Sequence, residues 1–147
     1  MREATKGELS MKNPYYIPKY RYYELKYRCR QYNDWLEGFN DATGYLATHD
    51  TSKERVDGGE QRDLVYEAMI KRQYYKVRMD TLKHCLLSLP MYLQNPIFEA
   101  VTEGKGWQVI QARHELTCTR DEYYKAYHYF FYIYSKCSDA SDRFVYR

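Results

Sequence analysis

Four side chains near the C-terminus have the chemistry needed to contact a nucleic acid. They are Arg120, Tyr124, Lys125 and His128. Arginine can donate two parallel hydrogen bonds to guanine, and lysine can bind a phosphate or a base edge. Tyrosine and histidine can contact phosphates or thymine methyl groups. In a helix that advances about 100° per residue, the last three share one side and Arg120 lies at its edge. A DNA-reading surface and an ordinary solvated face both fit this spacing.

Catalytic and metal-binding chemistry has little support in the sequence. His114 and Cys118 form an isolated His-x-x-x-Cys pair, and His84 and Cys85 are only adjacent. A structural zinc site needs four ligands at recognisable spacing. The chain has no glycine-rich phosphate loop, no nucleophile elbow and no His-Glu-x-x-His motif. We therefore expect a protein without enzymatic activity, bound metal or other cofactor.

The elements that would position the four candidates follow an all-α pattern. Pro96 begins an apolar helical segment, which Gly104-Lys105-Gly106 interrupts because glycine disfavours helix and permits turns. Trp107 to His114 fits a short second helix. Thr119-Arg120-Asp121-Glu122 is a capping box, which predicts the start of a third helix that ends near Lys136. Two short helices before a longer, capped helix are typical of a helix-turn-helix. The residues predicted to face the core from the third helix are Tyr123, Ala126, Tyr127, Phe130 and Tyr134.

The N-terminal segment predicts a basic amphipathic helix. Apolar residues recur at alternating spacings of three and four from Lys19 to about Phe39. Five cations flank this stripe, and they are candidates either for phosphate contacts or for a solvated flank. They are Lys19, Arg21, Lys26, Arg28 and Arg30. Residues 40–59 carry three glycines and few apolar side chains, which predicts a loop or linker.

A long middle helix is predicted from about Glu60 to Leu89, and Pro90 ends it. Its apolar surface is wide enough for packing on two sides, within the monomer or against a second copy in a homodimer. The chain therefore divides into three segments. Residues 1–39 form an N-terminal extension and the basic helix, residues 40–59 a linker, and residues 60–147 the long helix with the helix-turn-helix unit.

Composition permits nucleic-acid binding without requiring it. The 147 residues carry a net charge of +3. The net charge is +4 in residues 1–35, −3 in residues 36–104 and +2 in residues 105–147. Phosphate contacts are therefore expected from the two basic ends. No apolar run approaches the roughly 20 residues that span a membrane. The four cysteines lack CxxC spacing and no targeting segment is recognisable, which predicts reduced thiols and a cytoplasmic protein.

Both ends of the chain carry a family resemblance. At the N-terminus it rests on residues 12–19, residues 22–27 and Gln31-Tyr32. At the C-terminus it rests on residues 100–104, Cys118, Arg120-Asp121, Tyr123-Tyr124, Phe130-Phe131 and Ser135-Lys136. These stretches resemble a family of small proteins from bacteriophages and prophages of Gram-positive bacteria. Its members are similar to the C-terminal DNA-binding region of sigma factors and to ArpU-type late transcription regulators. The resemblance implies a helix-turn-helix that binds double-stranded DNA and regulates transcription in the bacterial host cell.

A protein-binding role is the alternative. The third helix carries Lys125-Ala126 and His128-Tyr129 where the family has a more charged, arginine-bearing stretch. The chain also holds 19 tyrosines, and tyrosine is enriched at protein interfaces. The same fold would then inhibit or redirect a host factor, such as RNA polymerase or a defence nuclease of the CRISPR effector type.

Overall fold

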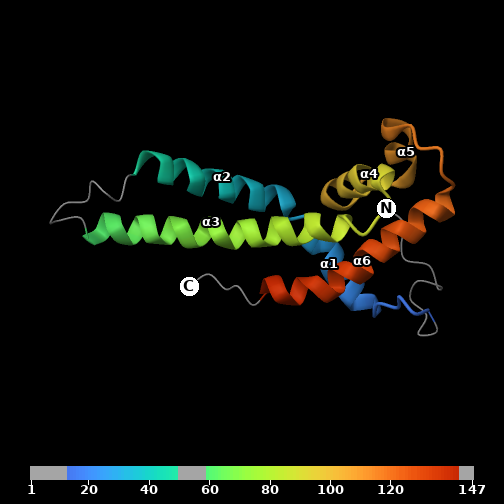
Figure 1. The fold of residues 1–147 in the computed structure, drawn as a ribbon, viewed down its shortest axis with the longest axis horizontal. Coiled ribbons are helices and arrows are strands. Elements are labelled where there is room, and N and C mark those ends of the chain that lie inside the picture. Colours follow the sequence, from blue (N-terminus) through green and yellow to red (C-terminus); the bar gives the residue numbers. More distant parts are fainter. Residues whose placement is uncertain (1–12, 50–58, 143–147) are drawn as a thin grey trace.

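The computed structural model describes residues 13–49 and 59–142. Within these ranges there are six helices and no strand, which confirms the all-α fold class. No helix in these ranges is long and apolar enough to cross a membrane. In chain order the helices are α1 (Lys19–Cys29), α2 (Tyr32–Thr48), α3 (Gly59–Leu86), α4 (Met91–Glu103), α5 (Trp107–His114) and α6 (Arg120–Asp142) (Figure 1).

The predicted N-terminal helix is divided, and the loop prediction that followed it is wrong for residues 40–48. α1 ends at Cys29, and α2 begins at Tyr32 and continues to Thr48. α2 lies along α3, and Ala42 is buried between the two helices. Packing against α3 therefore stabilises a helix whose glycine and polar residues disfavour it locally. Residues 50–58 of the predicted linker lie outside the described residues.

The predicted bounds of the later helices differ less from the observed ones. α3 ends at Leu86, three residues before the predicted end, and Pro90 occupies the N-cap of α4. Pro96 lies inside α4 instead of beginning it. α5 has the predicted bounds, and α6 begins after Thr119 as predicted but extends beyond Lys136 to Asp142.

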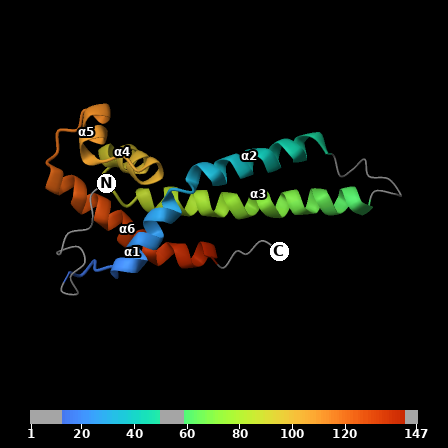
Figure 2. The same ribbon diagram turned by 180° about the vertical axis from the view of Figure 1, so that it is seen from behind.

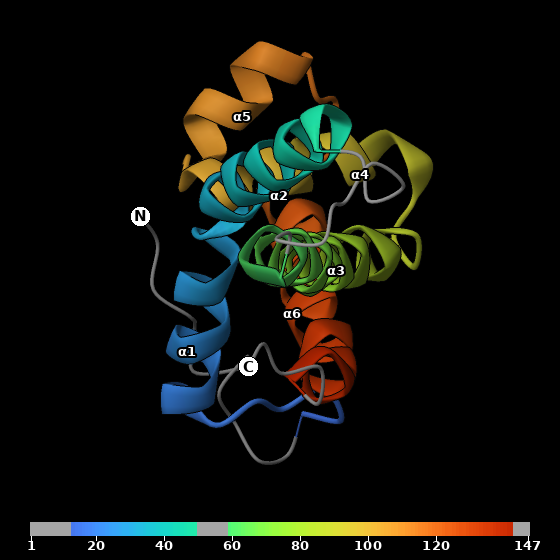
Figure 3. The same cartoon turned by 90° about the vertical axis from the view of Figure 1, so that its left-hand side faces the viewer.

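α3 is the helix around which the others are arranged. Figures 1 and 2 show α2 alongside the first part of α3, while α1, α4 and α5 gather near its C-terminal end. The view along α3 shows that α2 and α6 lie on opposite sides of it (Figure 3). The N-terminal part of α3 and the C-terminal part of α2 therefore project together from the rest of the molecule.

α6 contributes the largest fully buried aromatic side chains to the core that it forms with α1, α4, α5 and the C-terminal part of α3. Tyr123, Phe130, Phe131 and Tyr134 are each at most 1% exposed. Their rings meet other aromatic rings mostly edge to face, an arrangement that the ring quadrupole favours. The predicted core face of this helix is confirmed, with Ala126 half-buried at its border.

Candidate nucleic-acid interface

The turn between α5 and α6 has a defined geometry. α5 ends at His114. The C-cap residue Glu115 adopts a left-handed conformation with φ 52° and ψ 46°, a region that few residues other than glycine occupy. Gln111 bonds to the far side of the turn twice. Its carbonyl accepts from the Leu116 N–H at 3.1 Å, and its side-chain amide donates to the Leu116 carbonyl at 3.1 Å. These two hydrogen bonds fix the direction in which the chain leaves α5.

The Thr119 half of the predicted capping box is present at the start of α6. The Glu122 N–H donates to the Thr119 hydroxyl at 3.1 Å, and the Tyr123 N–H donates to the Thr119 carbonyl at 3.0 Å. Asp121 and Glu122 place negative charge at the positive end of the helix dipole, where it is stabilising.

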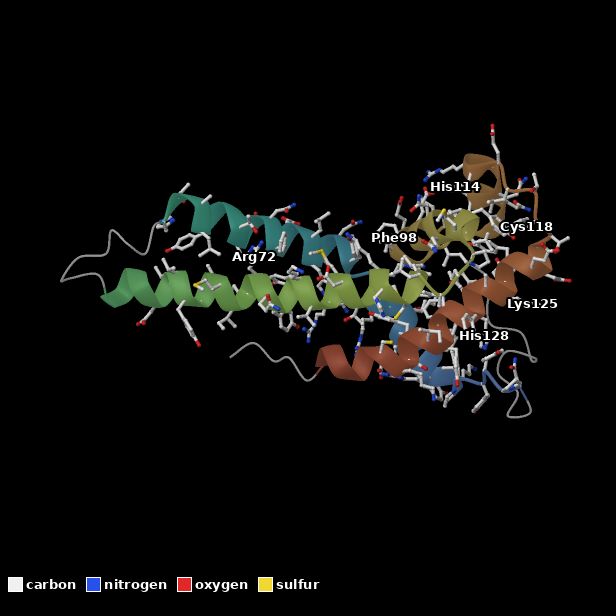
Figure 4. All side chains as sticks on the ribbon, viewed as in Figure 1. Arg72, Phe98, His114, Cys118, Lys125 and His128 are labelled. Atoms are coloured by element: carbon white, nitrogen blue, oxygen red, sulfur yellow. The ribbon has the colours of Figure 1, made fainter. Side chains whose placement is uncertain are left out.

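The four candidates on α6 do not share an exposed face. Arg120 and Lys125 are exposed, and the Arg120 guanidinium lies 5.7 Å from the centre of the Tyr124 ring. Tyr124 and His128 are only 8% and 5% exposed, so the prediction that both face outward is wrong in this conformation. Lys125 and His128 lie one turn apart on α6 (Figure 4).

The N-terminal segment explains the burial of His128. The His128 Nε2–H donates to the Tyr15 carbonyl at 2.7 Å, which requires a hydrogen on Nε2. The Tyr15 ring lies 5.2 Å and 5.1 Å from the rings of Tyr129 and Tyr132. Residues more than 100 positions away in the sequence therefore cover this side of α6, and the helical period alone cannot reveal such a cover.

Most of the predicted phosphate-binding cations of α1 make contacts within the chain. Arg21 pairs with Glu24 and donates to the Ser138 hydroxyl at 2.9 Å. Lys26 is only 8% exposed, with its ammonium 5.4 Å from the centre of the Tyr23 ring, so the prediction of a solvent-facing cation is wrong at this position.

Of the remaining predicted cations, Arg28 and the α1 C-cap residue Arg30 also make contacts within the chain, and Lys19 does not share these contacts. The Arg28 guanidinium lies 3.9 Å from the Glu24 carboxylate, and the Arg30 guanidinium lies over Gly104, whereas Lys19 is exposed. α1 also packs beside the C-terminal half of α6. Arg120 and Ser138 are separated by about 27 Å of helix, so the structure does not bring the two predicted sets together.

An ion-pair cluster that sequence reasoning missed holds α5 against α4. Both Arg113 and His114 of α5 contact the Glu99 carboxylate of α4. The hydrogen bond from His114, supported by Arg113, holds the pKa of Glu99 below its usual value. The sequence contains a partial indication of this cluster. A glutamate on one helix can contact cations at the end of the next helix when a short turn joins the two.

A broad groove runs beside the first turns of α6, between the N-terminal segment and the α3–α4 turn. Its volume is about 930 Å³. Tyr15 and Tyr92 are exposed at its rim, and Lys125 and Tyr129 line the α6 side. The groove contacts Tyr124, Lys125 and His128, and its lining is mainly aromatic and apolar.

His114 and Cys118 do not belong to a metal-ligand set. In residues 13–49 and 59–142, no three histidine, cysteine or acidic side chains gather in a way that would hold a metal ion.

Comparison with known proteins does not assign the chain to a family. No family model, curated protein or solved structure matches the chain.

Proposed function

We propose that this protein binds double-stranded DNA and regulates transcription of phage genes, with the first turns of α6 facing the major groove. The observation that supports this most is the succession of a short α5, a left-handed turn at Glu115 and a capped α6 that exposes Arg120 and Lys125. In helix-turn-helix proteins the N-terminal residues of the second helix contact base edges. The resemblance of both chain ends to phage regulators favours the same function.

The exposed groups have distinct roles in this proposal. Arg120 reads guanine through paired hydrogen bonds, and a cation–π contact with the Tyr124 ring helps to orient its guanidinium. Lys125 contacts phosphate or a neighbouring base edge. Tyr124 and His128 act from within the core, where they fix the position of α6. No cofactor or catalytic step is involved.

The test begins with selection of bound sequences from a random duplex pool at low salt. Arg120→Ala should lower the preference for the selected sequence by about 1–3 kcal/mol at one base position. Lys125→Ala should weaken binding to all sequences and reduce the salt slope by about one. Lys76→Ala is the matched control, because Lys76 is an exposed lysine of α3 that pairs with Asp80 and lies outside α5 and α6.

Two outcomes would refute the proposal. One is the recovery of no sequence above the background of the pool. The other is an equal effect of Arg120→Ala and Lys76→Ala on sequence preference, since a non-specific charge effect does not distinguish the two positions.

A second function is favoured by the groove beside α6. We propose as the alternative that the protein binds a host protein, such as RNA polymerase or a defence nuclease, through this tyrosine-rimmed surface. Tyrosine is enriched at interface hot spots, and the exposed first turns of α6 carry as many acidic as basic side chains. Binding to such a partner should depend weakly on salt, whereas DNA binding should weaken steeply. Tyr92→Ala separates the two roles, because Tyr92 is 55% exposed at the groove and lies outside α5 and α6.

A further inference from the structure

Three of the four cysteines, far apart in sequence, meet where three helices pack together. Cys29 comes from α1, Cys85 from α3 and Cys137 from α6. Cys29 and Cys85 are buried in the hydrophobic core, and Cys137 packs against it while remaining partly exposed. The side chains of Cys85 and Cys137 lie within hydrogen-bonding reach of each other, and Cys29 lies near Cys85. α3 and α6 are also packed against each other, so their backbones hold this pair in place.

We propose that Cys85 and Cys137 are an oxidation site, at which hydrogen peroxide converts the two thiols to an intramolecular disulfide. In the first step the Cys137 thiolate attacks one peroxide oxygen, the O–O bond breaks, and hydroxide leaves. Cys137 is then a sulfenic acid. In the second step the Cys85 sulfur attacks the Cys137 sulfur, the S–O bond breaks, and the hydroxyl leaves as water with the Cys85 proton. Two thiols and one peroxide thus give one disulfide and two waters.

Access decides which sulfur reacts first. Burial raises the pKa of Cys29 and Cys85 well above the usual value for a thiol, so neither is a good first nucleophile at neutral pH. Cys137 is the member of the cluster that solvent reaches. Once Cys137 is oxidised, Cys85 is the resolving partner because its side chain already lies within hydrogen-bonding reach of Cys137.

Cys118 is excluded as a partner by its position. It precedes α6, whereas Cys137 lies about 26 Å along the helix from Arg120, the first residue of α6. The Cys85–Cys137 link would close a loop of about 50 residues that contains α4, α5 and most of α6, and it would bind the C-terminal half of α6 to α3. The link therefore acts on the whole unit that carries Arg120 and Lys125, although it does not depend on what that unit binds.

The experiment uses the full chain, treated with hydrogen peroxide and then denatured and alkylated. We expect the number of alkylated thiols to fall from four to two, with a mass loss of two hydrogens per chain. Peptide mapping should join Cys85 to Cys137. The thermal midpoint should rise and return to its starting value after dithiothreitol. Cys137→Ser and Cys85→Ala should each abolish the link, whereas the control Cys118→Ser should retain it.

The proposal is overturned by several results. Four alkylated thiols after treatment would show that the pair is inert. A mapped link between Cys29 and Cys85, or between two chains, would show that the wrong pair was chosen. Conversion of Cys137 to sulfinic acid while Cys85 stays a free thiol would show that Cys85 does not resolve the intermediate. Cys85→Ala keeps the site apolar, so loss of the link in that folded variant is distinguishable from unfolding.

Discussion

Gly104 offers the sharpest test of how α4 ends and leads into α5. It ends α4 with φ 73° and ψ 31°, and its N–H donates to the Ala100 carbonyl at 2.8 Å. A side chain other than hydrogen in this left-handed region costs about 1–2 kcal/mol. A Cβ on Gly104 would also overlap the Arg30 guanidinium. Because the guanidinium is the end of a flexible side chain, most of that overlap is relieved by movement. Gly104→Ala should therefore lower the free energy of unfolding by about 1–2 kcal/mol, and slightly more if Arg30 is held firmly.

The measurement is denaturant unfolding of the wild type and the variant, supported by thermal unfolding. A loss of this size should lower the thermal midpoint by about 3–8 °C in a chain of this length. Arg30→Ala in the Gly104→Ala background separates the two causes. It removes the overlap but leaves the backbone strain, so the double variant should recover only the smaller part of the loss.

Gly44→Ala is the matched control, because it makes the same chemical change with the opposite expected sign. Gly44 lies within α2, and a Cβ there meets no other atom within 4 Å. Replacing glycine inside a helix should stabilise the protein by about 0.5–1 kcal/mol. Equal stability of Gly104→Ala and wild type would refute the left-handed end of α4. A loss of stability in Gly44→Ala would refute the extension of α2 beyond residue 39.

What the sequence could predict was local. The bounds of α5 follow from the glycines before it, and the start of α6 follows from Thr119 and Glu122 three residues apart. The core face of α6 follows from its helical period, because the aromatic side chains of that helix recur at the right spacing. These features depend on residues within a few positions of each other, so a single sequence contains them.

What the sequence could not predict depends on distant partners. The chain turns between Cys29 and Tyr32 without glycine or proline, so no local signal marks the end of α1. Residues 40–48 read as a loop by composition and become helical because α3 lies beside them. Helix propensity differs between residues by less than about 1 kcal/mol, which tertiary packing readily outweighs.

The candidate site shows the same limit more sharply. A helical wheel correctly separates Tyr127 from Lys125, but it cannot show that the backbone at Tyr15 returns to cover His128. It also cannot show that Lys26 lies among tyrosine rings. A cation counted from the sequence is available for phosphate only when the fold leaves it exposed, and burial here removes part of the expected basic surface.

Two further predictions concern the contacts that hold α5 and α6. Thr119→Ala should destabilise the protein by roughly 1 kcal/mol, because the Glu122 N–H loses its acceptor; equal thermal midpoints would count against the cap. Glu99→Gln should cost about 1 kcal/mol at neutral pH, because Arg113 and His114 lose a charged acceptor. The folded-state pKa of Glu99 is lowered, so its contribution is present above the usual glutamate pKa and is lost as the pH falls through the folded value. The stability difference between wild type and Glu99→Gln, measured by urea unfolding across pH, should therefore shrink on acidification. A difference that persists unchanged at pH values below the folded-state pKa of Glu99 would show that Glu99 acts through packing and not through its charge.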